Sequence, residues 1–312
     1  MDVATGIIIL SETLLGALGN CSLLYHYLFL YCTEGRVRAT DFILMHLTVS
    51  NSLAILSKGL PQTLAALGLT HFISDLECCL LRYVQRLAKC MSIGTTCVLS
   101  VFQAIMVSPM DSCCKDLKVK APQYVTVSVS FCWILYVSVN IIFPVYILYI
   151  SGNWSMINIT NKRDLGYCYS YDNENVSGPV YLILLVLPEL LFSVLIVWAN
   201  GSMILFLYRH KQRVQHIHRN HVSSRSSAES RATQRILVLV STFVYFYILA
   251  SLFRIFMALF DDENWWLINT ENIISLCFPT VSPFLVMRRD SPVFRASFAM
   301  MKNKKSRYHT PK

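Results

Sequence analysis

The chain has 312 residues, of which 54% are apolar and 14% are charged, and its mean hydropathy is +0.49. A soluble domain of this composition would have too little polar surface, which excludes a soluble helical core. The net charge of +9 would fit a nucleic-acid-binding protein. Because the basic residues stand next to apolar segments, attraction to anionic membrane lipid is the simpler explanation, and we expect no nucleic-acid partner.

Seven apolar segments predict an all-α membrane protein, a seven-transmembrane helix bundle. Each is long enough to cross about 30 Å of hydrocarbon, which takes roughly 20 residues in a helix. The predicted spans are residues 5–31, 42–67, 80–107, 124–150, 180–208, 236–260 and 265–287. Since no loop between them reaches thirty residues, we expect a single membrane domain over residues 1–312, ending in a short basic tail at residues 288–312.

The basic residues predict the orientation, because cytoplasmic loops retain Lys and Arg. Two follow the first span, three lie in residues 115–120, seven in residues 209–235, and eight in the tail. The loops on the opposite face carry only Lys162 and Arg163. The N-terminus is therefore predicted to be extracellular and the C-terminus cytoplasmic.

Cysteines and glycosylation sequons mark the outer face. Of the eleven cysteines, only Cys78, Cys79 and Cys168 fall on the oxidising side, where disulfides persist. A bond from Cys78 or Cys79 to Cys168 would hold the long outer loop over the end of the bundle, leaving one cysteine unpaired. That loop also carries Asn-x-Ser/Thr sequons at Asn153, Asn158 and Asn175.

Ionisable residues inside the spans are costly, at about 3 kcal/mol each near the bilayer centre, so each needs a partner or a polar cavity. They are Glu12, Lys58, Arg82, Arg86, Lys89, Glu189 and Arg254. Arg82, Arg86 and Lys89 are spaced i, i+4 and i+7 and share one helix face. One interpretation is a ligand pocket for electron-rich or anionic groups, with Tyr83, Gln85 and Glu189 nearby. The other is an ion pair of Glu189 with Arg86 or Lys89 that orients helices.

Motifs for catalysis are missing from the sequence. There is no His-Glu-x-x-His, no Gly-rich phosphate loop and no Ser, His and Asp in a hydrolase context. The seventh span lacks the lysine that retinal requires, and neither half of the chain repeats the other, as transporters often do. We therefore expect no enzyme, no cofactor and no metal site, and interpret the bundle as a receptor.

Several blocks of sequence resemble the vomeronasal type 1 receptors, a family of G-protein-coupled receptors. These blocks are Ser-Ile-Gly-Thr-Thr-Cys-Val-Leu-Ser-Val-Phe-Gln-Ala-Ile-Met-Val-Ser-Pro at residues 92–109, residues 158–160, 166–168, 209–217 and 231–234, and Phe-Pro-Thr-Val-Ser-Pro-Phe at residues 278–284. The resemblance runs essentially from end to end. It implies a plasma-membrane receptor for small pheromone-like molecules that activates an inhibitory-class heterotrimeric G protein.

The resemblance also implies roles for particular residues. It selects Cys78 as the partner of Cys168, and Asn158 as the preferred glycan site. The family shares the basic pair at Arg86 and Lys89, which leaves Arg82 as the better candidate for ligand specificity. G-protein contacts are expected at Gln103, Ser108, Arg209, Lys211, Arg213, Arg231 and Arg235, although the basic residues could equally anchor lipid headgroups.

A more distant similarity to rhodopsin-like receptors is incomplete. Asn51 stands where those receptors have a sodium-binding aspartate, and Gln85 where amine receptors have an aspartate, which argues against biogenic amines. Phe102-Gln103-Ala104 replaces Asp-Arg-Tyr. Two alternatives to the vomeronasal assignment are an anion transporter or channel that uses the basic face of the third span, and a bitter-taste-like receptor.

Overall fold

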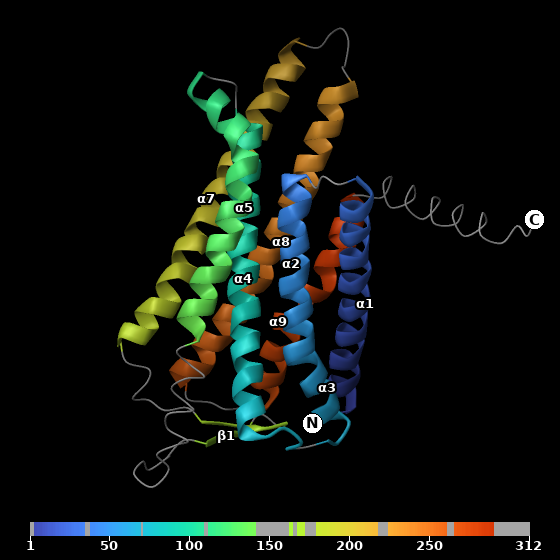
Figure 1. Cartoon of the computed structure of the whole chain (residues 1–312), viewed down its shortest axis with the longest axis vertical. Helices are drawn as coiled ribbons and strands as arrows, with labels where there is room; N and C mark the ends of the chain where they lie inside the picture. Colours follow the sequence, from blue (N-terminus) through green and yellow to red (C-terminus); the bar gives the residue numbers. More distant parts are fainter. Residues whose placement is uncertain are drawn as a thin grey trace, which may run out of the picture.

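The structure is a computed structural model that describes residues 3–34, 38–69, 71–108, 112–141, 162–164, 167–171, 179–217, 224–260 and 265–289. Its long helices run side by side as an upright bundle (Figure 1). In chain order the elements are α1 (Val3–Glu34), α2 (Ala39–Ala54), the π-helical turn η1 (Ile55–Gly59), α3 (Leu60–Ala66), α4 (Asp75–Val107), α5 (Ser112–Asn140), β1 (Lys162–Asp164), β2 (Tyr169–Tyr171), α7 (Pro179–Ile217), α8 (Ser224–Phe260) and α9 (Trp265–Arg289).

Seven helical segments in this part of the chain are long and apolar enough to cross a membrane. The predicted class, an all-α bundle of seven membrane helices, is confirmed. Large apolar side chains cover the outside of the bundle, among them Leu18 on α1, Ile134 on α5 and Trp198 on α7, each about two-thirds exposed. Such a surface would be insoluble in water and suits contact with lipid.

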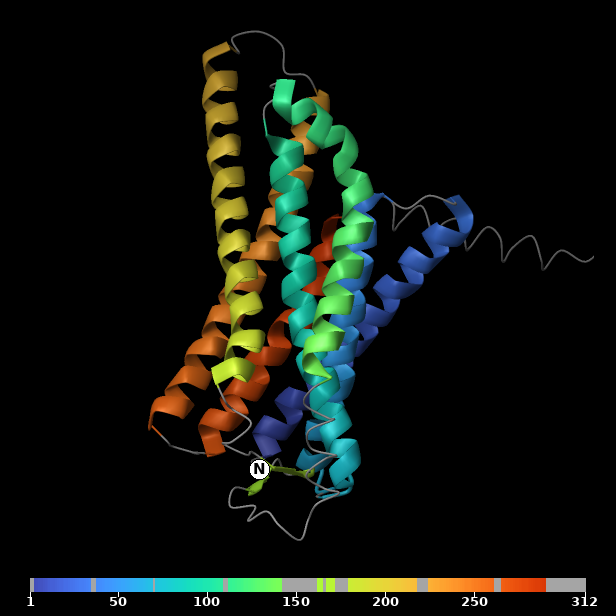
Figure 2. The same cartoon turned by 60° about the vertical axis from the view of Figure 1, so that its left-hand side comes forward.

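Helix α4 forms the centre of the bundle. Its most apolar window is 67% buried, against 17% for that of α7, and it packs against α2, α5, α7 and α8. Figure 2 shows α4 and α5 side by side, while α1 crosses the bundle obliquely. Residues on α4 are therefore placed to face several helices at once, which makes it the natural wall of an internal site.

Helix α4 begins before the apolar segment of the sequence because polar groups stabilise its start. Helix α4 starts at Asp75, after the cap residue Ser74. The Ser74 hydroxyl accepts a hydrogen bond from the Glu77 backbone N–H, and Glu77 Oε2 accepts one from the Ser74 backbone N–H at 3.0 Å. This reciprocal capping box satisfies two donors at the helix start.

A proline inside a helix leaves one backbone carbonyl without its usual donor. At two of the helix prolines in the described residues, an amide side chain supplies a donor instead. Pro283 has no N–H for the carbonyl of Pro279, which accepts a hydrogen bond from Asn20 Nδ2 of α1 at 2.9 Å. Pro61 likewise has none for the carbonyl of Ser57 in η1, which accepts from Gln85 Nε2 of α4 at 2.7 Å. These bonds tie α1 to α9 and η1 to α4.

A close approach between α1 and η1 gives the first prediction. A Cβ on Gly59 would lie 2.6 Å from Thr13 Oγ1, and Thr13 is buried and held by a bond from its hydroxyl to the Ile9 carbonyl. We expect Gly59→Ala to destabilise the bundle by about 1–3 kcal/mol through overpacking. A Cβ on Gly201 of α7 would meet nothing within 4 Å, so Gly201→Ala should stabilise by roughly 0.5–1 kcal/mol. Thermal unfolding of the two purified variants measures both changes in stability, which we expect to have opposite signs. If both variants were less stable than wild type, this explanation would be wrong.

The strands β1 and β2 form an antiparallel hairpin in which Lys162 pairs with Tyr171 and Asp164 with Tyr169. The hairpin lies across one end of the bundle, beside the starts of α1 and α4 (Figure 1). We call this the hairpin end. The sequons at Asn153, Asn158 and Asn175 and the tail from residue 290 lie outside the described residues, as does the side chain of Arg254.

Candidate functional site

A cavity of about 220 Å³ lies between α2, η1, α4, α8 and α9. Much of its wall is apolar, with aromatic rings from Phe243, Phe246 and Phe278. The polar and charged residues that line it are Asn51, Lys58, Gln85, Arg86, Lys89, Ser92, Tyr247 and Ser275. A mainly apolar space with a few polar groups is the usual character of a small-molecule site.

Only some of the residues predicted on the basic face of the third span line this cavity. Arg86 and Lys89 line it together with Gln85, whereas Arg82, Tyr83 and Glu189 do not. Arg82 lies one turn nearer the hairpin end of α4 than Arg86, and the part of α4 that lines the cavity begins at Gln85. Of the two arginines, only Arg86 is therefore positioned in the cavity wall, and the predicted specificity role of Arg82 has no support from the cavity geometry.

Lys89 forms the ion pair that the sequence offered as one alternative. Its Nζ lies 2.9 Å from Glu189 Oε2 on α7 and 5.6 Å from the centre of the Tyr247 ring on α8. The Tyr247 hydroxyl donates to the same carboxylate oxygen at 3.1 Å. One carboxylate thus joins α4, α7 and α8 beside the cavity, and a cation–π contact adds to the attraction.

Lys58 forms a second ion pair, with a residue that our reading of the sequence missed. Its Nζ lies 3.0 Å from Glu271 Oε2 on α9 and also donates to the Ser275 hydroxyl. Glu271 is not among the ionisable residues named from the sequence, although it falls within the seventh predicted span. An unpaired lysine in the second span was the signal that could have found it, because such a cation needs a carboxylate partner.

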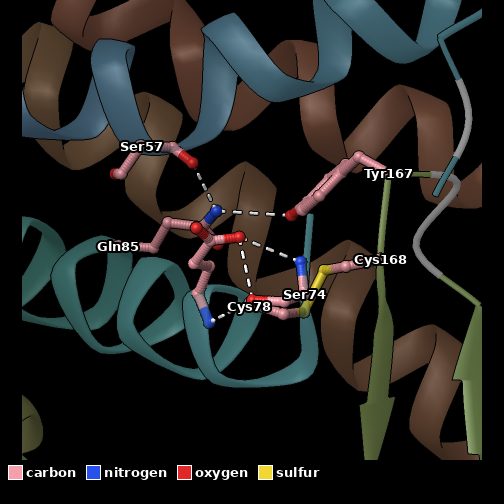
Figure 3. The surroundings of a disulfide bond; sticks show 7 residues. Ser57, Ser74, Cys78, Gln85, Tyr167 and Cys168 are labelled. Atoms are coloured by element: carbon pink, nitrogen blue, oxygen red, sulfur yellow. Dashed lines mark hydrogen bonds between the residues drawn. A yellow bond between two sulfur atoms is a disulfide. The ribbon is translucent and has the colours of Figure 1, made fainter. Parts of the chain in front are cut away.

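Gln85 links the cavity to the hairpin. Its Nε2 donates to the Ser57 carbonyl and, at 3.4 Å, to the hydroxyl of Tyr167 (Figure 3). Tyr167 is 3% exposed, and burial raises the pKa of its hydroxyl, which therefore stays protonated at neutral pH. The backbone N–H of Ile73 also donates to the Tyr167 carbonyl. The loop is thereby held against the end of the cavity.

The disulfide joins Cys78 of α4 to Cys168, the residue after Tyr167 (Figure 3). This is the pairing that the family resemblance implied, and Cys79 is buried and free. Cys78, Tyr167 and Cys168 form one buried cluster. The covalent bond and the Tyr167 hydrogen bond therefore fix adjacent loop residues to the same helix.

The residues predicted to contact a G protein lie toward the opposite end of the bundle. Gln103 on α4 is buried, and the Ser108 carbonyl at the end of α4 accepts a hydrogen bond from Lys118 Nζ at 2.5 Å. Arg209 on α7 and Arg235 on α8 are exposed. Lys211, Arg213 and Arg231 lie in the same two helices, but their side chains are outside the described part of the chain.

Within the described residues, no three His, Cys, Asp or Glu side chains come together in a way that could hold a metal ion. The cavity instead combines aromatic walls, hydrogen-bonding side chains and two ion pairs. These groups can hold an organic molecule and sense its polar atoms. They are also shared among helices that could move relative to one another, which is the requirement for a receptor site.

The bundle has the fold of the rhodopsin-type, G-protein-coupled receptors. The crystal structure of squid rhodopsin superposes with a TM-score of 0.66, covering 91% of this chain and 77% of the rhodopsin chain at 14% sequence identity. At that identity the similarity concerns the fold alone.

The family follows from closer relatives. The profile of the vomeronasal organ pheromone receptor family matches residues 3–299. The Homo sapiens vomeronasal type-1 receptor 4 is 50% identical over 297 residues, covering 95% of this chain and 97% of that receptor. The Danio rerio olfactory receptor class A-like protein 1 is 27% identical over 283 residues, covering 90% and 88%. The chain therefore belongs to the vomeronasal type 1 receptor family, which is a family of receptors and not of enzymes.

Proposed function

We propose that the protein is a plasma-membrane receptor that binds small, pheromone-like extracellular molecules in the cavity and activates an inhibitory-class heterotrimeric G protein. The cavity carries the proposal, because its walls come from four of the membrane helices and contain hydrogen-bonding groups among aromatic rings. A molecule bound there contacts α2, α4, α8 and α9 together. If it fits one arrangement of these helices better than another, it shifts their equilibrium.

The two ion pairs give this shift a physical basis. Lys58–Glu271 joins η1 to α9, and Lys89–Glu189 joins α4 to α7, with both lysines in the cavity wall. A polar ligand atom near either ammonium competes with the carboxylate for it. Ligand binding and helix separation are thereby coupled through the same side chains.

In the proposed orientation the hairpin end faces outward and the ends of α7 and α8 near Arg209 and Arg235 face the cytoplasm. The distribution of basic residues supports this, as does the disulfide, which persists on the oxidising side. Exposed Arg209 and Arg235 are then available to the G protein. Gln103 is 7% exposed, so its contact requires the helices to open first.

The test uses two arginines one turn apart on α4. In cells displaying an extracellularly tagged receptor, G-protein dissociation is measured against volatiles, steroids and sulfated steroids. We expect Arg86→Ala, in the cavity wall, to raise the effective concentration of an active ligand by roughly ten-fold or more, as loss of a charged hydrogen bond does. Arg82→Ala, outside the wall, should change it little at equal surface level.

The other outcomes separate the alternatives. A larger effect of Arg82→Ala would make Arg82 the specificity residue and place the contact outside this cavity. Anion flux without G-protein dissociation would favour the transporter or channel. The bitter-taste alternative lacks a supporting observation, because the sequence matches the vomeronasal family along nearly all of its length.

A further inference from the structure

The deep end of the cavity, away from the hairpin, contains two buried polar atoms without hydrogen-bond partners among the described residues. They are Oδ1 of Asn51 on α2 and Oγ of Ser92 on α4, and both residues line the cavity. Asn51 is 2% exposed and Ser92 is 8% exposed. Buried polar atoms of this kind are uncommon in folded proteins, and each requires an explanation.

The neighbouring contacts indicate which of these atoms can accept a hydrogen bond and which can donate one. Asn51 Nδ2 donates to the Ser282 hydroxyl of α9 at 2.7 Å. In this arrangement the amide oxygen is the atom left to accept a hydrogen bond. Ser92 lies seven residues after Gln85 on α4, on the helix face that lines the cavity. Its hydroxyl can rotate to donate. The deep end therefore has one hydrogen-bond acceptor, Asn51 Oδ1, and one adjustable donor, the Ser92 hydroxyl.

We propose that this deep end is a subsite for a hydroxyl group of the ligand. The ligand O–H donates to Asn51 Oδ1, and the ligand oxygen accepts from the Ser92 hydroxyl. The proposal rests on the proposed function and narrows its ligands to molecules that carry a hydroxyl group on a compact apolar skeleton. The skeleton packs against the apolar wall formed by Ile93, Phe243 and Phe278.

Other polar groups suit these two atoms less well. A ketone accepts from Ser92 but has no hydrogen for Asn51. A carboxylate would place its negatively charged oxygens next to the Asn51 amide oxygen, and the two groups would repel each other. A cation meets the positive charges of Lys58, Arg86 and Lys89, which line the same cavity. Among these groups, only a hydroxyl satisfies both atoms without adding charge.

The test compares borneol with camphor, which share one bicyclic skeleton and differ in carrying a hydroxyl or a carbonyl. Thermal unfolding of the full-length purified receptor at increasing concentrations gives an apparent Kd for each, because a bound ligand stabilises the folded state. We expect borneol to bind roughly ten-fold more tightly than camphor. Ser92→Ala should reduce this preference to about two-fold or less. Since Ser92 has no described partner to lose, the ligand-free variant should unfold no earlier than wild type.

Ser100→Ala is the matched control. Ser100 lies two turns further along α4, is fully buried, donates to the Thr96 carbonyl at 2.8 Å, and does not line the cavity. The Ser100→Ala receptor should still bind borneol more tightly than camphor. Equal binding of the two compounds to wild type, which would assign the subsite to water, overturns the proposal. So does an unchanged preference in Ser92→Ala, or no stabilisation by either compound.

The experiment separates this proposal from the proposed function because unfolding is measured without a G protein. If the receptor prefers borneol through Ser92 but never dissociates a G protein, the subsite is supported and the proposed signalling function is contradicted. Ligand-dependent dissociation with no alcohol preference would do the reverse.

Discussion

Replacement of Cys168 by serine is expected to remove most folded receptor from the cell surface. The disulfide links residues 90 positions apart in sequence, and in the chain-entropy view closing such a loop contributes about 4–5 kcal/mol. Both cysteines are 1% exposed, so the change also leaves a buried thiol and a buried hydroxyl. The residue next to Tyr167 then has no covalent link to α4. Surface labelling of a tagged receptor, with total expression measured in parallel, checks the loss.

Cys79→Ser provides a close control. Cys79 is adjacent to Cys78 on α4, is also buried at 4% exposure, and is free. Its replacement should cost little more than the burial of one hydroxyl, and surface display should stay near the wild-type level. If both variants lost display equally, the effect would come from burying serine at this end of the bundle and not from loss of the disulfide.

The seven membrane helices could be predicted from sequence because hydrophobic length is a one-dimensional property. A segment such as residues 236–260 is recognisable without knowing its neighbours, since lipid imposes the same requirement on every helix. Choosing Cys78 over Cys79 as the partner of Cys168 was harder. Adjacent residues on a helix point about 100° apart, and only the family resemblance indicated which one faces the loop.

The composition of the site depended on how far the cavity extends along each helix, which the sequence does not give. Spacing placed Arg82 and Arg86 on one face of α4, yet only Arg86 lines the cavity. The π-helical turn η1 (Ile55–Gly59) also changes the direction of the side chains in that part of the second span, and Lys58 lies within the turn. The pairing of Lys58 with Glu271 therefore emerged only from the three-dimensional structure.

Breaking the Lys58–Glu271 ion pair is expected to have the second large effect on stability. Lys58→Met should destabilise the receptor by about 3 kcal/mol, because it leaves Glu271 without its cation in a low-dielectric bundle. The Glu271 side chain is 11% exposed and that of Lys58 is 19% exposed, so little water can replace the lost partner. Glu271→Leu should cost a similar amount, because Lys58 would keep its hydrogen bond to Ser275 but lose its carboxylate partner. Thermal unfolding of the purified variants measures both.

The double variant Lys58→Met with Glu271→Leu should recover most of the lost stability, since well-packed apolar residues can replace an ion pair at little cost. Losses that simply add in the double variant would show that the two residues do not act as a pair. Because Lys58 also lines the cavity, the stable double variant then isolates its part in signalling. A receptor as stable as wild type but unresponsive to an active ligand would show that this ion pair serves ligand binding or helix movement and not only stability.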